Sequence, residues 1–222
     1  MMLTANDLSM NFNDAGQLVK VFSGVNLELE SATTVAIVGN SGVGKTTLLN
    51  ILGGLEKPVT GYARLGDKDC FLGDSDPIFR AKNFGFIFQS HNLLSDFTAL
   101  ENVMMPLMIL GSSLDEAKSL ASDLLVKVGL QERKQHKTLL LSGGEQQRVA
   151  IARAMVTKPS VILADEPTGN LDKNNSDKIA RLLLDAREFN KASVIVVTHS
   201  MEFAQKMQRV LRLTKDGLEE VS

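Results

Sequence analysis

The sequence predicts an α/β domain that has a mostly parallel core sheet, an antiparallel β edge and an inserted helical subdomain. Three observations favour this fold class: strand-like and helical hydrophobic periods alternate along the chain, the amino-terminal part is the more strand-like, and the middle part is helical. The chain has 222 residues, of which 44% are hydrophobic and 23% are charged, so it is long enough to bury a sizeable core. We expect one domain with two lobes.

The first elements expected along the chain are two paired strands. Val25, Leu27 and Leu29 alternate with polar residues, which is the pattern of a half-buried strand. The preceding Asp14-Ala-Gly16 can turn the chain, and it would pair this strand with an earlier one. An antiparallel β edge is the expected result.

Three short apolar runs rich in β-branched residues are expected to form the centre of the sheet. A strand that is buried on both faces has such a continuous apolar pattern, which is typical of parallel sheets. The runs cover residues 35–38, 161–163 and 194–197.

Helical patterns dominate the middle of the chain. Thr98-Ala-Leu-Glu101 and Ser113-Leu-Asp-Glu116 are capping-box patterns, and each opens an apolar-periodic stretch. Gly129 follows the second stretch as a stop signal. We therefore expect a helical subdomain inserted in the α/β core.

The boundaries predicted for this subdomain are residues 89 and 158. Residues 1–88 and 159–222 would form the core with its β edge, and residues 89–158 would form the helical subdomain. No repeat, low-complexity tract or long linker separates these segments in the sequence, so the subdomain should pack on the core.

Composition and charge argue against several classes of function. The 24 Lys and Arg residues against 26 Asp and Glu residues leave a formal charge of -2, which provides no basic field for nucleic acid or acidic lipids. The uncharged run at residues 31–44 contains glycines and is shorter than the roughly 20 apolar residues of a spanning helix, and no secretion signal is recognisable. A single cysteine, Cys70, permits no internal disulfide and fits a reducing cytosol.

The strongest functional signal is a glycine-rich phosphate-binding pattern between a buried strand and an apolar helix expected at residues 48–55. Glycines let backbone N–H groups curl around a β-phosphate, Lys45 would reach the β and γ oxygens, and the Thr46 hydroxyl would ligate Mg²⁺. A Gly-rich turn without a ligand is the alternative, and this context argues against it. The nucleotide-binding candidates are Gly39, Asn40, Ser41, Gly42, Val43, Gly44, Lys45, Thr46 and Thr47.

Two carboxylates follow another buried strand. The run at residues 161–164 leads directly to Asp165 and Glu166, and ligands of open α/β sheets collect at the carboxyl ends of the strands. Asp165 suits Mg²⁺ through water, and Glu166 suits the attacking water. A strand that simply meets a solvated loop is the alternative, and the upstream phosphate-binding pattern favours the functional interpretation.

The sequence Leu-Ser-Gly-Gly-Glu-Gln-Gln-Arg at residues 141–148 resembles the signature of ATP-binding cassette (ABC) transporter ATPases. The residues also predict a phosphate-binding element without the resemblance. Ser142 and Glu145 would cap a helix that runs to about Thr157, and the two glycines leave the backbone N–H groups at its positive end uncovered. The resemblance implies an ABC nucleotide-binding domain of the P-loop NTPase class. It also implies that this element completes the ATP site of a second copy in an ATP-dependent head-to-tail dimer. The signature candidates are Ser142, Gly143, Gly144 and Glu145.

The resemblance spans essentially the whole chain. In the family, the aromatic matched by Phe12 stacks on adenine, the glutamine matched by Gln89 touches Mg²⁺ and senses the membrane partner, and the histidine matched by His199 contacts the γ-phosphate. The loop Gly169-Asn-Leu-Asp172 matches the loop that crosses the dimer interface. The alternatives are a plain core aromatic at Phe12 and a satisfied strand-end histidine at His199.

The resemblance implies an ATPase that converts ATP and water to ADP and phosphate, with ATP and Mg²⁺ bound. Separate transmembrane permease subunits would hold the chain peripherally at the cytoplasmic face of the inner membrane, and no nucleic acid partner is expected. The residues assigned to catalysis are Lys45, Gln89, Glu166 and His199; those assigned to Mg²⁺ are Thr46, Gln89 and Asp165; Asp172 and Phe12 join the nucleotide contacts.

Within the family, residues 84–94, 96–103 and 164–172 are most similar to the lipoprotein-releasing ATPases, which drive the extraction of lipoproteins from the bacterial inner membrane. Macrolide or peptide exporter ATPases and the cell-division ATPase share much of this sequence and stay as alternatives. A soluble ABC-type ATPase acting on nucleic acid is a remoter alternative, because the chain lacks a basic footprint and a heptad run.

The helix expected after Thr98 bears on the membrane partner. It is apolar nearly all round and carries Met104, Met105 and Met108. A buried helix of the helical lobe explains this composition. A methionine-lined groove that receives a short helix of the membrane subunits explains it equally well.

Overall fold

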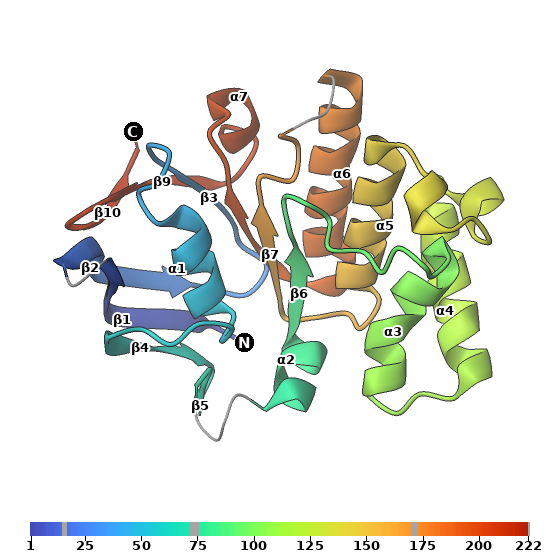
Figure 1. The fold of residues 1–222 in the computed structure, drawn as a ribbon, viewed down its shortest axis with the longest axis horizontal. Helices are drawn as coiled ribbons and strands as arrows, with labels where there is room; N and C mark the ends of the chain where they lie inside the picture. The colour runs from blue at the N-terminus through green and yellow to red at the C-terminus, as the bar shows by residue number, and fades with distance from the viewer. Residues whose placement is uncertain (15–16, 72–75, 170–172, 222) are drawn as a thin grey trace.

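The computed structural model describes residues 1–14, 17–71, 76–169 and 173–221, and it shows two β-sheets with helices packed around them (Figure 1). Over these ranges the larger sheet contains six strands, which are β3 (Thr34–Val38), β6 (Phe84–Ile87), β7 (Val161–Asp165), β8 (Ser193–Val197), β9 (Arg209–Thr214) and β10 (Gly217–Glu220). Their order is β10-β9-β3-β8-β7-β6. Neighbouring strands are parallel except for the antiparallel pair of β9 and β10.

The three predicted apolar runs form the centre of this sheet, as expected. β3, β8 and β7 are neighbours, and every residue in them is buried. Both faces are covered by helices, which include α1 (Lys45–Leu52), α5 (Gly143–Met155) and α6 (Lys173–Asn190). Because side chains alternate along a strand, Val35 and Ile37 pack on the side of α1, whereas Ala36 and Val38 pack on the side of α5 and α6.

The predicted antiparallel edge is a sheet of its own. It consists of β1 (Leu3–Asp14), β2 (Gln17–Leu29), β4 (Thr60–Leu65) and β5 (Lys68–Asp69), in the order β2-β1-β4-β5. Asp14 pairs with Gln17, which confirms the hairpin; Ala15 and Gly16 of the predicted turn lie outside the described residues. Helix α1 joins the two sheets, since its buried leucines and isoleucine share one hydrophobic cluster with strands from both.

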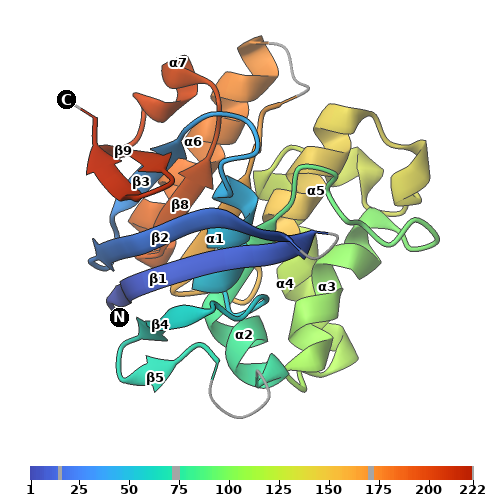
Figure 2. The ribbon, with the colours of Figure 1, turned by 60° about the vertical axis from the view of Figure 1, so that its left-hand side comes forward.

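The helical lobe lies to one side of the core sheet (Figure 2). Its cluster draws on α3 (Ala99–Ile109), α4 (Leu114–Lys127) and α5. Helix α5 also packs on the sheet through Ile151 and Ala154, so one helix belongs to both lobes. The remaining helices are α2 (Pro77–Asn83), α7 (Met201–Ala204) and two 3-10 turns at Gln131–Arg133 and Thr138–Leu140.

Helix ends follow the predicted signals, with local shifts. Thr98 and Glu101 make a complete capping box, whereas Ser113 accepts from the Glu116 N–H in a one-sided cap. The helix expected at residues 48–55 spans Lys45–Leu52, and α5 ends at Met155 before the expected Thr157. Helix α5 starts directly after Ser142, its predicted cap, and α1 starts directly after Gly44, three residues before its predicted start. Within the described part of the chain, no helix has both the length and the apolar character needed to cross a bilayer.

Candidate active site

One cavity of about 510 Å³ collects most of the predicted chemistry. It lies where β3 and β7 end at their carboxyl edges, and its walls come from segments far apart in sequence. The predicted residues that line it are Phe12, Ser41, Gly42, Gly44, Lys45, Thr46, Thr47, Gln89, Asp165, Glu166 and His199.

The glycine-rich loop wraps around the first turn of α1. Gly44 has φ 100°, and a Cβ at this position would lie 2.3 Å from Cγ1 of Val21, so both conformation and space require glycine. The Lys45 ammonium donates to the carbonyl oxygens of Gly39 at 3.0 Å and Asn40 at 3.1 Å. Val43 packs partly buried against the hydrophobic core and shapes the loop without lining the cavity.

The amino end of α1 is suited to bind an anion. No side chain of the described residues caps this helix, and its first turn contains no acidic residue. The first N–H groups of a helix have no intrahelical acceptor, and the helix dipole adds positive potential there. A phosphate in the cavity would accept hydrogen bonds from these N–H groups and be stabilised by the dipole, and Lys45 would add a positive charge.

Thr46 and Asp165 meet at the floor of the cavity. The Thr46 hydroxyl donates to the Asp165 carboxylate at 2.7 Å. Asp165 is only 6% exposed, and this burial raises its carboxyl pKa, although the hydrogen bond from Thr46 opposes the shift. A buried carboxylate beside a hydroxyl is a fitting pair of oxygen ligands for Mg²⁺, whose charge would offset the cost of burial.

The ligand set is small, which also suits Mg²⁺. Among the described residues there is no cluster of three or more His, Cys, Asp or Glu side chains that could hold a metal. Mg²⁺ characteristically takes one or two protein ligands and completes its shell with substrate phosphates and water. Gln89 lines the same cavity as Thr46 and Asp165.

Glu166 is held at the cavity wall by two neighbours. Its backbone has φ 43°, a left-handed conformation that is uncommon outside glycine and often found at functional sites. One carboxylate oxygen accepts from the Thr198 hydroxyl at 3.2 Å, and the other lies 2.9 Å from Nδ1 of His199. The His199 side chain is 70% exposed and lines the cavity, where a ligand can reach it, and its contact with Glu166 is also what a satisfied strand-end histidine would make.

Sequence reasoning did not single out Thr198, Val19 or Val21. Thr198 is fully buried, and its only signal is a hydroxyl residue at the end of an apolar strand. Val19 and Val21 line the cavity with Phe12, and Val19 pairs with Phe12 across the β1–β2 hairpin. Phe12 is 45% exposed, which excludes the alternative of a plain core aromatic. These three side chains form an apolar wall against which a flat base can stack.

The signature residues do not line this cavity. Ser142 and Glu145 form the predicted capping box at the start of α5, where Glu145 accepts from the Ser142 N–H at 2.9 Å. This hydrogen bond, with help from Arg133, lowers the pKa of Glu145 to about 2. A Cβ at Gly143 would meet no atom within 4 Å, so the helix end is open to solvent. Gly144 sits in the same first turn, and the predicted Asp172 lies outside the described residues.

The cavity therefore combines an uncapped helix start inside a glycine-rich loop, a hydroxyl and carboxylate pair, and a restrained second carboxylate. Such a combination, at the carboxyl edge of a parallel sheet, defines the class of P-loop nucleoside triphosphatases. Comparison with known proteins places the chain within this class. The family model described as ABC transporter matches residues 22–169, and the chain belongs to the ABC transporter family as one of its ATPase subunits.

Similar proteins extend over nearly the whole chain. It is 46% identical to the lipoprotein-releasing system ATP-binding protein LolD of Idiomarina loihiensis, covering 98% of this chain and 96% of the relative. Identity to LolD of Geobacter metallireducens is 47%, with 97% and 96% covered. The dimeric ATP-binding cassette MJ0796 bound to ADP and Pi superposes with a TM-score of 0.91 at 34% identity, covering 99% of both chains. The predicted family, fold and ATPase activity are confirmed.

Proposed function

We propose that this ATPase drives the release of lipoproteins from the bacterial inner membrane, through separate permease subunits. The observation that carries the proposal is the near full-length identity of 43–48% to proteins named for a lipoprotein-releasing system. The apolar groove described below supports a permease partner, and the absence of a spanning helix in the described residues agrees with a peripheral place at the cytoplasmic face.

For the reaction, we propose that Lys45 leaves the two loop carbonyls and contacts the β- and γ-phosphates. Thr46 and Asp165, with Gln89, would hold Mg²⁺, which supplies neutralisation of phosphate charge when bound. Glu166 accepts a proton from water, the water oxygen bonds to the γ-phosphorus, and the bond from that phosphorus to the ADP oxygen breaks. His199, beside Glu166, would bind the γ-phosphate.

The position of the signature helix end, away from the nucleotide cavity, favours a second copy of the chain as the partner. The open helix end at Ser142 and Gly143 provides N–H donors away from the cavity of its own chain. Two copies arranged head to tail would place the signature of each against the phosphates held by the other. The dimeric assembly of the similar cassette MJ0796 supports this arrangement. ATP would then stabilise the dimer, and hydrolysis would release it.

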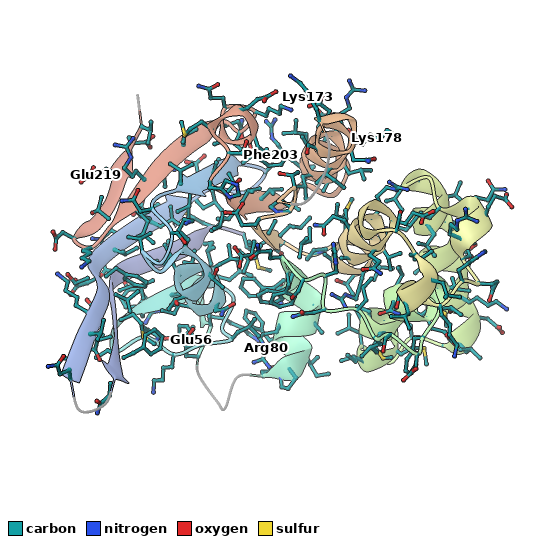
Figure 3. The ribbon with its side chains drawn as sticks, turned by 45° about the horizontal axis from the view of Figure 1, so that its top comes forward. Glu56, Arg80, Lys173, Lys178, Phe203 and Glu219 are labelled. Atoms are coloured by element: carbon teal, nitrogen blue, oxygen red, sulfur yellow. The ribbon has the colours of Figure 1, made fainter. Side chains whose placement is uncertain are left out.

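A groove of about 340 Å³ between the core and the helical lobe is the proposed contact for the permease. Its walls are apolar, with Phe84, Phe86, Pro106 and Ile109 facing the space. Two arginines, Arg80 and Arg153, add positive charge; Arg80 stands on α2 beside β6 in Figure 3. These features fit a short amphipathic helix that carries an acidic residue.

The methionines of α3 do not form this groove. Met104 is buried in the cluster of the helical lobe, and Met108 is 41% exposed but is not among the groove residues. The buried-helix interpretation therefore holds for Met104, and the groove is lined by Pro106 and Ile109 of α3 instead of the predicted methionines.

We predict that Ile109→Glu weakens association with the permease by roughly 2 kcal/mol or more, because it removes an apolar contact and places a second carboxylate near the acidic residue expected on the docked helix. Leu114→Glu, on exposed α4 surface away from the groove, is the matched control and should copurify normally. Met104→Glu should instead lower the melting temperature of the isolated chain. Full recovery of the permease with a stable Ile109→Glu variant would exclude this docking site.

Depletion of this protein in the bacterium that produces it tests whether lipoproteins are the transported substrate. We expect lipoproteins destined for the outer membrane to accumulate in the inner-membrane fraction, and wild-type chain but not Lys45→Ala to restore their transfer. Normal lipoprotein distribution with failed septation would support the cell-division alternative instead, and drug sensitivity alone would support an exporter. Copurification with nucleic acid in place of membrane proteins would contradict the transporter assignment.

A further inference from the structure

The turn that follows Gln89 has an unusual backbone. His91 has φ 62° and Asn92 has φ 47°, so two successive residues other than glycine adopt the left-handed conformation. Histidine and asparagine tolerate this conformation better than most residues, but it is still uncommon outside glycine, and two in succession define a tight, specific turn. Within the turn, the His91 N–H donates to the Phe88 carbonyl at 2.9 Å.

Arg153 ties this turn to helix α5. One guanidinium nitrogen donates to the Asn92 carbonyl at 2.6 Å, and a second donates to the His91 carbonyl at 2.8 Å. Burial lowers the pKa of Arg153, and no carboxylate among the described residues forms an ion pair with it. Two backbone carbonyls are therefore the acceptors for a largely desolvated cation, and a planar fork suits two adjacent acceptors.

The rest of the segment is fastened to the helical lobe as well. Asn102 of α3 is fully buried; its amide oxygen accepts from the Leu94 N–H at 2.8 Å, and its amide nitrogen donates to the carbonyls of Leu94 and Thr98, each at 3.0 Å. The Thr138 hydroxyl also donates to the Leu94 carbonyl. Residues 94–98 are thus fixed independently of Arg153. Between Gln89 and Asn92, the Asn92 N–H donates to the Ser90 carbonyl at 2.7 Å and the Ser90 hydroxyl donates to the Asn92 side chain at 2.9 Å, but these bonds stay within the turn, so Arg153 is what ties the turn to α5.

We propose that Arg153 is a positioning residue for Gln89: its guanidinium locks the left-handed turn so that Gln89 stays in the wall of the nucleotide cavity. Arg153 and Asn92 also line the apolar groove, so a helix docked there would act on Gln89 through this contact. The catalytic part of this inference rests on the proposed role of the cavity, whereas the lock itself is a property of the chain without ligands.

Arg187 provides a matched control. It lies on α6, and its guanidinium donates at 2.7 Å to the carbonyl of Ala32, which is also left-handed with φ 58°. Neither residue lines the nucleotide cavity or the groove. Arg187→Met therefore removes the same kind of bond at a comparable turn, without a connection to Gln89.

The first measurement is hydrogen exchange of the amides at residues 89–93 in the nucleotide-free chain. Thermal melting of each variant shows whether it is folded. Arg153→Met should speed this exchange at least tenfold while the exchange of residues 94–98 changes little. Because lysine keeps the charge but lacks the planar fork, Arg153→Lys should give an exchange rate between those of Arg153→Met and the wild type. Arg187→Met should leave residues 89–93 unchanged. Unchanged exchange in a folded Arg153→Met chain overturns the lock, whatever the function of the protein.

The second measurement is ATP turnover. Because a small misplacement of a catalytic group can cost up to about 100-fold, Arg153→Met should lower kcat roughly 10- to 100-fold while the Kd for ATP changes less than about threefold. The double variant Arg153→Met, Gln89→Ala should have the same kcat as Gln89→Ala alone, since both changes remove the contribution of Gln89. Losses that multiply in the double variant, or an equal loss of kcat in Arg187→Met, would refute the positioning role. A wild-type chain without ATPase activity would count against the proposed function and leave the exchange result standing.

Discussion

Glu166→Gln should bind ATP as the wild type does and lose roughly 10²- to 10⁴-fold in turnover, the usual cost of removing a general base. Glutamine has the same shape and can still accept from the Thr198 hydroxyl, which holds Glu166 at 3.2 Å. It cannot take a proton from water. Because binding is preserved and hydrolysis is blocked, the variant should accumulate as an ATP-bound dimer.

The measurements are steady-state ATPase rate in the assembled transporter, nucleotide binding, and dimer content with ATP by size-exclusion chromatography. Glu219→Gln, an exposed change on β10 that is labelled in Figure 3, should leave all three unchanged. An ATPase rate near that of wild type in Glu166→Gln would show that another group activates the water, and the catalytic assignment would then be wrong.

Ser142→Arg should abolish hydrolysis while leaving nucleotide binding in the same chain intact. Ser142 is exposed at the start of α5 and does not line the cavity, so a long charged side chain there obstructs only the face offered to a second copy. Loss of the cap alone costs about 1 kcal/mol of stability, and Ser142→Ala is the control for that smaller effect.

Mixing inactive chains tests whether the site is shared. A dimer of one Ser142→Arg chain and one Lys45→Ala chain has one site with an intact phosphate loop and an intact signature, so an equal mixture should regain roughly a quarter of wild-type activity if the two sites act independently. Lys45→Ala mixed with Glu166→Gln should regain none, because both residues line the cavity of one chain. A Ser142→Arg and Lys45→Ala mixture as inactive as its parents would contradict a site built from two copies.

Local patterns in the sequence were sufficient for the sheet centre, the phosphate loop, the capping boxes at Thr98 and Ser142 and the carboxylates at the end of β7. Each of these depends on neighbours in the chain: a run buried on both faces, glycines that permit positive φ, or a serine three residues before a glutamate. The family resemblance added Phe12, Gln89 and His199, which are uninformative alone and lie in one cavity. The predicted helix boundaries were less accurate. Helix α1 begins at Lys45 and not at residue 48, because its first turn is formed by residues that also belong to the phosphate-binding loop.

Tertiary structure alone decided which face of α3 is buried and which distant side chains are brought together. Met104 and Met108 look alike in sequence, yet one is core and the other exposed, because the faces of α3 meet different neighbours. Thr198 and Arg153 carry no motif; their roles arise from hydroxyl and guanidinium contacts to Glu166 and to residues 91–92, which are distant in sequence. Such contacts depend on the packing of α5 and β8 against the rest of the fold, and no local pattern encodes that packing.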